Sequence, residues 1–286
     1  MELLTKRVAA IHDLSGFGRC SLTVILPVLS AMGIQVCPVP TAVLSTHTGG
    51  LGTPVIKDLT DYLDPCLDHY KNLDIGFDAI YSGFLGNGKQ VESVLKYFES
   101  YPDALKFVDP VMGDNGKAYK TCDEDYQSQM KKLVCEADFI TPNLTEAFLL
   151  LGENPVCDGL SLENAKTICE KLSNLGPEKV LVHSLKLDTV GLCSIGFDRR
   201  KNTFWLFPNN EIPVSYPGCG DVFASVLLGS FLSDSDFPKA VSKATSFTEK
   251  CIKATYNYHT NPKYGLLFEN RLCTLLTNEK GIYETV

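Results

Sequence analysis

The sequence lacks several features that would assign it to other classes of protein. No apolar run approaches the roughly 18 residues that a membrane-spanning helix needs. Its beginning carries no apolar stretch ending in a small-residue cleavage site, so we expect no signal peptide and a cytoplasmic location. Basic residues are few, with 26 Lys and Arg against 34 Asp and Glu and a formal net charge of −8. Because such a chain lacks the basic field of a nucleic-acid binder, we expect neither a nucleic acid nor a membrane as a partner.

Paired cysteine motifs are absent as well. The chain has 11 cysteines, an odd number, and no two of them are spaced as C-x-x-C. This pattern disfavours a zinc ribbon or a dithiol redox site. Because several cysteines fall inside apolar runs, we expect reduced thiols that fill the core.

Short apolar runs alternate with longer amphipathic runs along most of the 286 residues. The predicted strands are 7–12, 34–40, 77–83, 105–110 and 138–142, with three closely spaced strands within 179–208 that favour an antiparallel edge. The predicted helices are 21–33, 54–70, 91–100, 143–151, 160–176, 219–232 and 238–256. This alternation predicts an α/β fold with a central, mostly parallel sheet covered on both faces. Since no linker is evident, we predict a single domain over residues 1–286.

Two glycine-rich segments approach nucleotide-binding motifs without completing them. Residues 83–90 nearly fit a P-loop, but Gln90 stands where a Ser or Thr hydroxyl should bind Mg²⁺. Residues 16–21 lack the third glycine of a dinucleotide fingerprint. We interpret the first segment as a strand-to-helix turn and the second as glycines that permit close backbone approach to a ligand.

The segment Gly218-Cys219-Gly220-Asp221 carries the strongest chemical signal, directly before an apolar helix. A glycine-rich turn that enters a helix presents free N–H groups and the positive end of the helix dipole, which suits a phosphoryl group in transfer. Asp221 lies beside that position, where a carboxylate can take a proton from an attacking alcohol. Taken alone, the segment also fits an ordinary turn with an acidic first-turn residue.

Two further segments place polar residues after predicted strands. Asp109 ends a strand and Asp114 follows five residues later. Two carboxylates near a polyphosphate suit Mg²⁺, although a turn and a solvated loop remain the alternative. Asn143 and Glu146 have the spacing of a capping box, and Glu146 can also reach a metal-bound water. A simple helix cap remains the alternative for that pair.

Together, these segments resemble the pyridoxal kinases of the ribokinase-like superfamily, in the same order and over nearly the whole chain. The matching segments are Asp109 to Asp114, Thr141 to Glu146, His47-Thr48-Gly49, Ser184 and Gly218 to Asp221. The resemblance implies a ribokinase-like three-layer α/β/α fold. It also implies an ATP-dependent kinase that phosphorylates the 5′-hydroxymethyl group of a B6 vitamer: pyridoxal, pyridoxine or pyridoxamine. A homodimer and a monovalent cation, often K⁺, are further family properties.

The resemblance assigns catalytic roles to the glycine-rich turn. It makes Asp221 the general base and the amides of Gly218, Cys219 and Gly220 the stabilisers of the transferring phosphoryl group. A thiol at a helix N-terminus can also have a lowered pKa. Cys219 is therefore a candidate to react with the pyridoxal aldehyde, and the alternative is a small residue that fills the turn.

The resemblance also assigns roles toward ATP. Asp109, Asp114 and Glu146 organise Mg²⁺ and the ATP phosphates. Asn143 and Ser184 contact phosphates or the water shell of the metal. We expect residues 114–122, which include Asn115 and Gly116, to form the loop that closes over ATP.

The substrate side departs from the family pattern. The resemblance places His47 and Thr48 near the pyridine ring, and Phe84 where many members have a stacking Tyr. Asp13, or Ser15 if a gap is allowed, stands in place of a Ser that contacts the ring. The D-x-S-G start also resembles hydroxymethylpyrimidine kinases, so such an enzyme, or one of dual specificity, is the alternative. A vitamer-binding protein without activity is a second alternative.

Overall fold

The computed structural model describes residues 5–155, 159–233, 235–276 and 283–286, so Cys157 lies outside the described residues. The chain divides into two compact units. Unit 1 comprises Met1–Ile80 and Glu211–Gly281, and unit 2 comprises Tyr81–Asn210 and Ile282–Val286. The division falls within strand β4 (Ala79–Ser82). The prediction of a single domain stays a prediction.

In unit 1, two long parallel strands carry the candidate substrate residues. β1 (Arg7–Phe17) pairs in parallel with β2 (Gln35–Thr46) along its whole length. Both strands extend well beyond the predicted ranges 7–12 and 34–40, because their pairing continues to Phe17 opposite Thr46. Asp13, which lies beyond the predicted range 7–12, is therefore inside the strand.

The predicted helix 54–70 is also corrected at its start. Residues Ile56–Asp58 form β3, which pairs antiparallel with residues 42–44 of β2. Helix α2 then begins after the turn and spans Thr60–Asn72. Pairing with β2 overrides the apolar pattern that suggested an earlier helix start.

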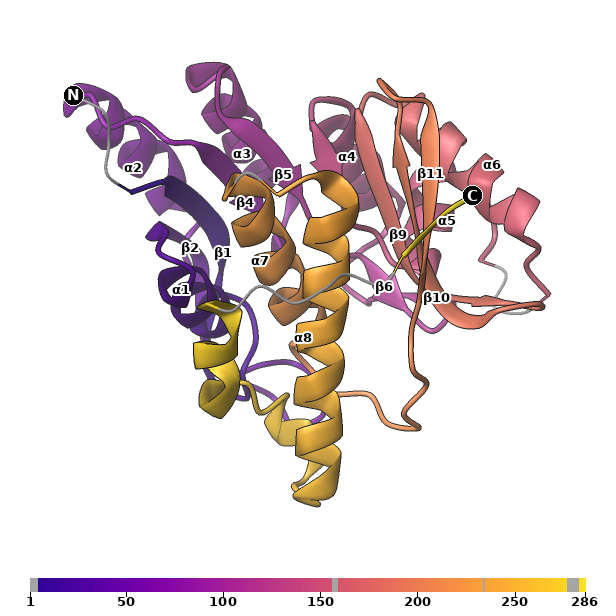
Figure 1. The fold of residues 1–286 in the computed structure, drawn as a ribbon. Coiled ribbons are helices and arrows are strands. Elements are labelled where there is room, and N and C mark those ends of the chain that lie inside the picture. The colour runs from indigo at the N-terminus through magenta and orange to yellow at the C-terminus, as the bar shows by residue number, and fades with distance from the viewer. Residues whose placement is uncertain (1–4, 156–158, 234, 277–282) are drawn as a thin grey trace. The chain divides into compact units, whose positions relative to one another are not determined.

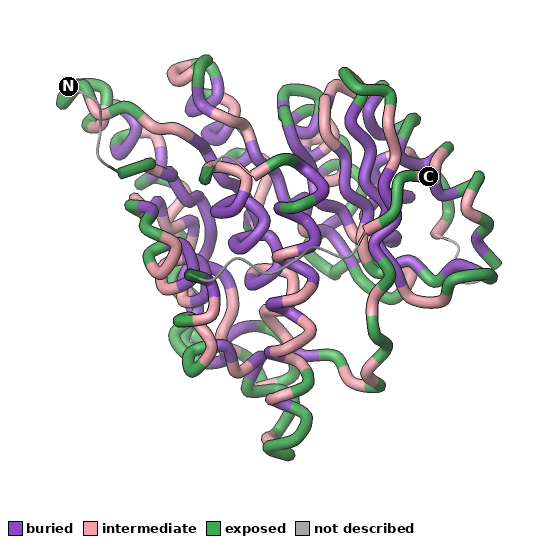
Figure 2. Tube along the Cα trace, in the orientation of Figure 1, coloured by how far each residue is buried: buried purple, intermediate pink, exposed green. Residues whose placement is uncertain are grey.

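The helices of unit 1 centre on a buried helix. α7 (Cys219–Leu232) has the predicted bounds, and all residues from Val222 to Ser230 are buried. A helix that is apolar on all sides needs cover on all sides, and α7 packs against α1 (Leu22–Ala31) and α8 (Phe237–Asn257). Figure 1 shows α7 beside α8, and Figure 2 shows how continuously α7 is buried. The 3₁₀ segments η1 (Pro262–Tyr264) and η2 (Glu269–Leu276) follow α8.

Unit 2 combines parallel and antiparallel pairing. The strands that pair in parallel are β5 (Leu105–Val108), β8 (Phe139–Ile140) and β9 (Lys179–Leu187). The strands that continue from β9 in antiparallel order are β10 (Gly191–Asp198), β11 (Thr203–Pro208) and β12 (Glu284–Thr285). This arrangement confirms the antiparallel edge predicted within 179–208. The helices are α3 (Gly88–Ser100), α4 (Glu124–Cys135), α5 (Leu144–Leu151) and α6 (Leu162–Ser173).

The incomplete P-loop forms the turn into α3. Asn87 caps this helix by accepting the N–H of Gln90. The buried side chain of Gln90 turns back and accepts the N–H of Gly86 at 2.7 Å. A side-chain oxygen thus takes one of the loop amides that a P-loop would offer to phosphate, which supports the interpretation as a turn.

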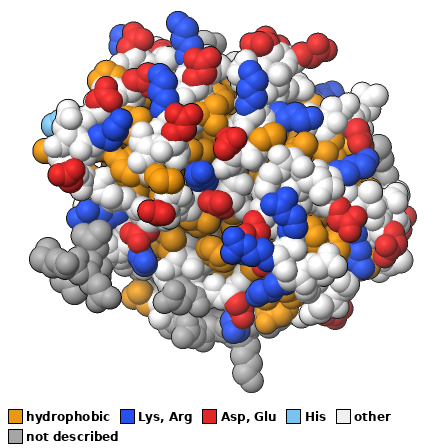
Figure 3. All heavy atoms as spheres, turned by 90° about the horizontal axis from the view of Figure 1, so that it is seen from above, with side chains coloured by type: hydrophobic (Ala, Val, Ile, Leu, Met, Phe, Trp, Pro, Cys, Tyr) orange, Lys and Arg blue, Asp and Glu red, His pale blue; other side chains and the backbone are white. Residues whose placement is uncertain are grey.

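The surface carries charges of both signs. On the face in Figure 3, Lys and Arg side chains are interspersed with Asp and Glu side chains among the described residues. Interspersed charges partly cancel at a distance, so they steer polyanions only weakly. No helix within the described residues is both long and apolar enough to cross a membrane.

Candidate active site

The N-terminus of α7 forms an open turn in unit 1. Gly218, the N-cap residue, has a φ of 81°, and a Cβ placed on it would lie 1.9 Å from the carbonyl oxygen of Arg19. The N–H of Cys219 donates to the carbonyl of Tyr216 at 3.3 Å. Within the described chain, the N–H groups of Gly220 and Asp221 have no acceptor. The turn therefore leaves two amides for a ligand at the positive end of the helix dipole.

Asp221 has the properties expected of a general base, because its pKa lies close to neutral pH. Burial, together with the smaller effect of the nearby Asp13 carboxylate, raises the pKa of Asp221 to about 6, although the backbone of Ser21 opposes the shift. The side chain keeps some exposed surface, as a group that meets a substrate must. A carboxylate of this pKa is mostly ionised at neutral pH and still accepts protons readily.

The helix N-terminus does not lower the pKa of Cys219. Burial raises the pKa of this thiol to about 12, and the charge of Asp221 adds to the rise. The dipole is outweighed because the thiolate would be desolvated beside a carboxylate. Cys219 is therefore a neutral thiol at physiological pH, which favours the alternative of a small residue that fills the turn.

Asp13 is held by hydroxyl groups of its own chain. It is 4% exposed, and its two carboxylate oxygens accept from Ser15 at 2.8 Å and from Ser21 at 2.5 Å. Burial raises the pKa of Asp13, and both hydroxyl bonds oppose that rise. The structure thus brings Asp13, Ser15 and Asp221 together, with Asp13 engaged inside the protein.

His47 fixes the loop that follows β2. Its Nδ1 accepts the N–H of Gly49 at 2.9 Å, so its Nε2 carries the proton and donates to the carbonyl of Lys263 at 2.7 Å. With both ring nitrogens engaged, His47 is buried and holds the loop, while Thr48 beside it is exposed. Of this predicted pair, Thr48 is the side chain presented to solvent.

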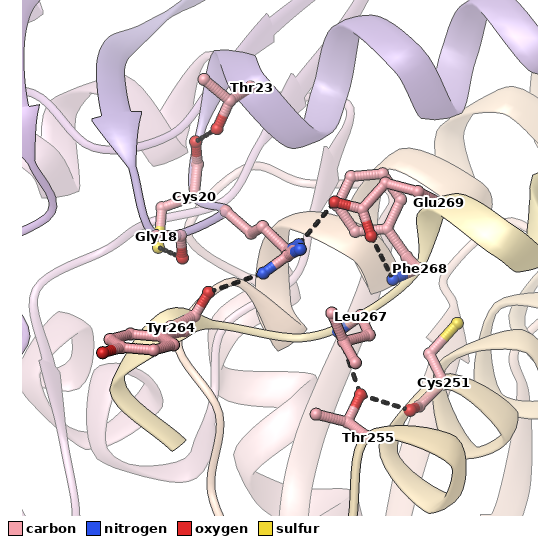
Figure 4. Close-up of polar contacts among 10 residues, drawn as sticks. Gly18, Cys20, Thr23, Cys251, Thr255, Tyr264, Leu267, Phe268 and Glu269 are labelled. Carbon is pink, nitrogen blue, oxygen red and sulfur yellow. Dashed lines mark hydrogen bonds and ion pairs between the residues drawn. The ribbon is translucent and has the colours of Figure 1, made fainter. Parts of the chain in front are cut away.

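The segment after α8 braces the loop between β1 and α1 (Figure 4). The guanidinium of Arg19 pairs with Glu269 at 2.5 Å and donates to the carbonyl of Tyr264 at 3.0 Å. At the other side, Thr255 of α8 accepts the N–H of Leu267 at 2.9 Å. Sequence analysis missed Arg19, because its partners lie about 250 residues away and only its position next to Gly18 gives a local signal.

Unit 2 brings Asp109 and Glu146 together. Both are buried, and burial followed by the charge of Asp109 raises the pKa of Glu146 well above its usual range. The two carboxylate oxygens of Glu146 accept the N–H groups of Met112 at 3.1 Å and Asn143 at 2.9 Å. Glu146 therefore acts as the predicted capping residue and secures the loop after β5, with both oxygens already engaged.

Asn143 joins the same loop to α5. Its side-chain oxygen accepts the N–H of Glu146 at 2.9 Å, which completes a reciprocal capping box. Its side-chain amide donates to the carbonyl of Gly113 at 2.8 Å. Asn143 thus fixes both the start of α5 and the backbone beside Asp114.

We predict that Asn143→Ala lowers the free energy of unfolding by about 1–2 kcal/mol, because it removes the helix cap and the anchor of Gly113. Chemical denaturation measures this change. Asn143→Ser is the matched control, since its hydroxyl oxygen still caps the helix, adds no charge to the acidic cluster, and is shorter than the amide that donates to Gly113. A full loss in the control as well would show that the Gly113 anchor, and not the cap, carries the stability.

Asp114 lies on a short hairpin. β6 (Gly113–Asp114) and β7 (Lys117–Ala118) are joined by Asn115 and Gly116, whose φ angles are 51° and 75°. Positive φ at both positions is typical of a type I′ hairpin turn. Residues 114–118, predicted as part of a closing loop, thus have a defined hairpin structure, and Asp114 is exposed on it.

Tyr119 is a residue that sequence analysis missed. Burial and the charges of Asp114, Glu146 and Asp109, in that order, raise the pKa of its phenol, so the hydroxyl lies near all three carboxylates. The only signal in the sequence is an aromatic hydroxyl directly after the glycine-rich hairpin.

Ser184 projects from a bulge in β9. The register of β9 with β10 shifts at this point, and Ser184 has a φ of 58° and is exposed. Its hydroxyl is 3.0 Å from Nδ1 of His183. Burial lowers the pKa of His183 to about 4, so the ring is neutral at physiological pH. The backbone of His183 also forms an isolated parallel β-bridge with Asn143, the N-cap residue of α5. Ser184 therefore directly follows a residue that pairs with this cap.

Phe84 follows β4 in unit 2 and is partly exposed. It lies in a different unit from Asp13, His47 and Thr48. Its predicted stacking on a pyridine ring therefore stays a prediction.

The acidic residues suit Mg²⁺ only when phosphate and water oxygens complete the coordination shell of the metal. Among the described residues, no group of three or more His, Cys, Asp or Glu side chains is arranged to hold a metal ion. All three carboxylates accept hydrogen bonds within the protein: Glu146 from the N–H groups of Met112 and Asn143, Asp114 from Asn115, and Asp109 from Thr141. Each carboxylate oxygen that accepts one hydrogen bond keeps a lone pair for a cation. This set suits Mg²⁺, which usually takes one or two carboxylates and completes its shell with phosphate and water.

An open helix N-terminus, a buried carboxylate beside it and a cluster of acidic residues are the features expected of one class of protein, the α/β phosphotransferases. More specifically, the chain belongs to the phosphomethylpyrimidine kinase family, whose model matches residues 26–266.

Solved structures of related proteins agree over nearly the whole chain. A provisionally named phosphomethylpyrimidine kinase of Bacteroides thetaiotaomicron is 39% identical, with a TM-score of 0.94 over 100% of this chain and 99% of that one. A second crystal form of it contains pyridoxal and has a TM-score of 0.93 at 39% identity, covering 99% of this chain and 100% of that one. A pyridoxal kinase of Leishmania donovani, solved with ADP and pyridoxamine, is 25% identical with a TM-score of 0.81 over 98% of both chains.

A curated pyridoxal kinase of Histophilus somni is 28% identical over 247 residues, which cover 80% of this chain and 82% of that protein. These relatives confirm the ribokinase-like α/β fold and the enzyme class predicted from the sequence, a kinase of the pyridoxal kinase type.

Proposed function

We propose that this chain transfers the terminal phosphoryl group of ATP to the 5′-hydroxymethyl group of a B6 vitamer. The observation that supports the proposal is Asp221, a carboxylate with a pKa of about 6 in the first turn of α7, beside its open amides. The pyridoxal in the Bacteroides thetaiotaomicron structure supports a B6 vitamer as the substrate. The ADP in the Leishmania donovani structure supports ATP as the donor.

In unit 1, Asp221 takes the proton of the hydroxymethyl group as its oxygen attacks phosphorus. The N–H groups of Gly220 and Asp221 receive the charge on the phosphoryl oxygens. Gly218 shapes the turn, while the amide of Cys219 donates mainly to Tyr216. Thr48 contacts the pyridine ring from a loop that His47 holds in place. Phosphoryl transfer needs chiefly this kind of positioning and charge stabilisation.

In unit 2, Asp109 and Asp114 would hold Mg²⁺, and Asn143 and Ser184 would contact phosphate oxygens or the water shell of the metal. Mg²⁺ supplies neutralisation of phosphate charge when it is bound with ATP. Glu146 supports this cluster by fixing the backbone of Met112 and Asn143. A cation near the buried pair of Asp109 and Glu146 would also offset their repulsion.

A second candidate function is phosphorylation of hydroxymethylpyrimidine, alone or together with a B6 vitamer. The segment Asp13-Leu14-Ser15-Gly16 favours it, as does membership of the phosphomethylpyrimidine kinase family. Both substrates offer a hydroxymethyl group on a nitrogen heterocycle, so the same base serves both reactions.

The test is ATP consumption with pyridoxal, pyridoxine, pyridoxamine and hydroxymethylpyrimidine in the presence of Mg²⁺, with and without K⁺. We expect the highest kcat/KM on a B6 vitamer. A higher kcat/KM on hydroxymethylpyrimidine would select the second function. Tight vitamer binding with no ATP consumption would indicate a binding protein and contradict both.

The same preparation tests the remaining expectations. Omission of Mg²⁺ should abolish turnover, and omission of K⁺ should lower it if the family's monovalent cation is used. Light scattering tests the proposed homodimer, and cell fractionation tests the proposed cytoplasmic location.

A further inference from the structure

The main chain of Arg19, in the loop between β1 and α1, lies directly against the start of α7. A Cβ placed on Gly218, the N-cap of α7, would lie 1.9 Å from the carbonyl oxygen of Arg19 and 3.7 Å from the Cα of Cys20. Arg19 itself has a φ of 53°, which residues with a side chain rarely adopt. The position of this loop therefore bears on the turn whose amides are proposed to receive the phosphoryl group.

The side chain of Arg19 is held by the segment that follows α8. Its guanidinium pairs with Glu269 at 2.5 Å and donates to the carbonyl of Tyr264 at 3.0 Å (Figure 4). Gly265 permits the close approach of this segment, since a Cβ there would lie 2.1 Å from the carbonyl oxygen of Gly18. A planar guanidinium can serve a carboxylate and a carbonyl at once, because its donors have fixed directions.

The same segment also contacts the turn before α7. The N–H of Leu266, which is fully buried, donates to the carbonyl of Pro217 at 3.2 Å. Residues 264–269 thus touch both the Arg19 loop and the residue before Gly218, all within unit 1. The side chains of Arg19 and Glu269 are 30% and 48% exposed, and such a pair contributes little to stability. Its effect should therefore be on local geometry.

We propose that Arg19 is a positioning residue for the turn at Gly218, because its held side chain keeps its main chain against the N-cap of α7. The amides that follow, of Gly220 and Asp221, are thereby held in one arrangement. This inference rests on the proposed function, since it takes those amides as the ones that receive the phosphoryl group. A misplacement of about 1 Å at such a site can cost about 100-fold in rate.

Arg19→Met tests the proposal, because methionine keeps an unbranched apolar stem and removes both hydrogen bonds of the guanidinium. We expect kcat on pyridoxal to fall about 10- to 100-fold, while the KM values for ATP and pyridoxal change less than about twofold. The turn acts on the phosphoryl group in transfer, so poorer alignment lowers kcat and not substrate binding. Steady-state kinetics measures both quantities.

Glu269→Ala separates a positioning role from direct contact between Arg19 and phosphate. It keeps the guanidinium but removes its carboxylate partner. If Arg19 acts through this pair, kcat should fall at least about threefold, and the double variant should be as active as Arg19→Met alone. Arg19→Lys should lie between wild type and Arg19→Met, since an ammonium keeps the charge but lacks the planar pair of donors.

A measurement without turnover follows the turn itself. In ¹H–¹⁵N spectra of the whole protein, the amide signals of Gly220 and Asp221 should shift in Arg19→Met and, to a smaller extent, in Glu269→Ala. Gly220→Ala and Asp221→Asn assign the two signals. These shifts report the local geometry of the turn whether or not a substrate is phosphorylated.

Lys171→Ala is the matched control, because it breaks a comparable ion pair in unit 2, with Glu153 at 2.7 Å, between side chains that are 48% and 40% exposed. It should leave kcat and both amide signals unchanged.

Unchanged amide signals in Arg19→Met, or a wild-type or higher kcat in Glu269→Ala, would overturn the proposal. If Arg19→Met does not fold, Arg19→Lys and Glu269→Ala decide by the same two measurements. If the wild-type chain phosphorylates no B6 vitamer, the proposed function fails, while the amide shifts still decide whether Arg19 positions the turn.

Discussion

Asp221→Asn is expected to lower kcat for the hydroxymethyl substrate by about 10²–10⁴-fold, the range typical of a lost general base. Asparagine has nearly the same shape as aspartate, so the turn before α7 should be preserved. ATP binding should be largely unaffected, since asparagine keeps the backbone N–H at position 221 and the residues predicted to bind Mg²⁺ and the other phosphates lie in unit 2. Steady-state kinetics and ATP titration by calorimetry measure the two effects. A near-normal kcat would remove Asp221 from the role of base.

The same substitution is expected to stabilise the protein at neutral pH. Burial raises the pKa of Asp221 from 3.8 to about 6. Because the folded-state pKa is the higher one, ionisation costs more in the folded state, and stability falls as the pH rises from about 4 through 6. The shift corresponds to at most about 3 kcal/mol, and partial exposure reduces it, so we expect a gain of about 1–2 kcal/mol.

Unfolding in urea at two pH values separates this effect from a general one. Asp221→Asn should exceed wild type in stability at pH 8 and match it near pH 4. Asp61→Asn, at an exposed carboxylate in α2, is the control and should change stability little at either pH. Equal stability of Asp221→Asn and wild type at pH 8 would mean that ionised Asp221 carries no burial cost in the folded protein.

The sequence predicted best what local patterns determine. The bounds of α7 follow from a glycine-rich turn and a continuous apolar run, and α5 begins at the predicted capping box of Asn143 and Glu146. Both features depend on neighbouring residues alone. The positions of the chemical segments along the chain could also be predicted, because ligands bind such sheets at the carboxyl ends of the strands.

What the sequence could not predict depends on partners far along the chain. β1 and β2 are longer than their apolar cores because each continues to pair with the other. Pairing of residues 56–58 with β2 replaced the predicted helix start. No local pattern marks either event, since the partner strand supplies the hydrogen bonds.

The chemical state of the site residues also depended on packing. The helix dipole predicted a lowered pKa for Cys219, yet burial raises it. Glu146 was predicted near the metal, but two backbone amides already engage its carboxylate. Asp13 was predicted to contact the substrate, but two serine hydroxyls bind it. Sequence spacing did not reveal these neighbours in space, and the roles of Glu146 toward the metal and of Asp13 toward the substrate stay predictions.

Gly218 and Gly220 lie two positions apart, but alanine is expected to have different effects at the two. Gly218→Ala should lower the stability of the fold, whereas Gly220→Ala should lower the activity of a stable protein. At Gly218, a methyl group would lie 1.9 Å from the carbonyl oxygen of Arg19, at a φ of 81°. Since both obstacles are backbone, neither can move cheaply, and we expect a loss of about 2–4 kcal/mol in the free energy of unfolding. Activity should fall with the lost structure.

At Gly220, a methyl group would meet no atom of the described residues within 4 Å. Alanine is a better helix former than glycine, so stability should stay the same or rise by about 0.5–1 kcal/mol. The methyl group would nevertheless enter the space before the amides proposed to receive the phosphoryl group, and kcat should fall at least about tenfold. Urea unfolding and kinetics on the same samples measure both quantities. A stable Gly220→Ala variant with wild-type kcat would show that this open space does not receive the phosphoryl group, because a bound phosphoryl and the new methyl cannot both occupy it.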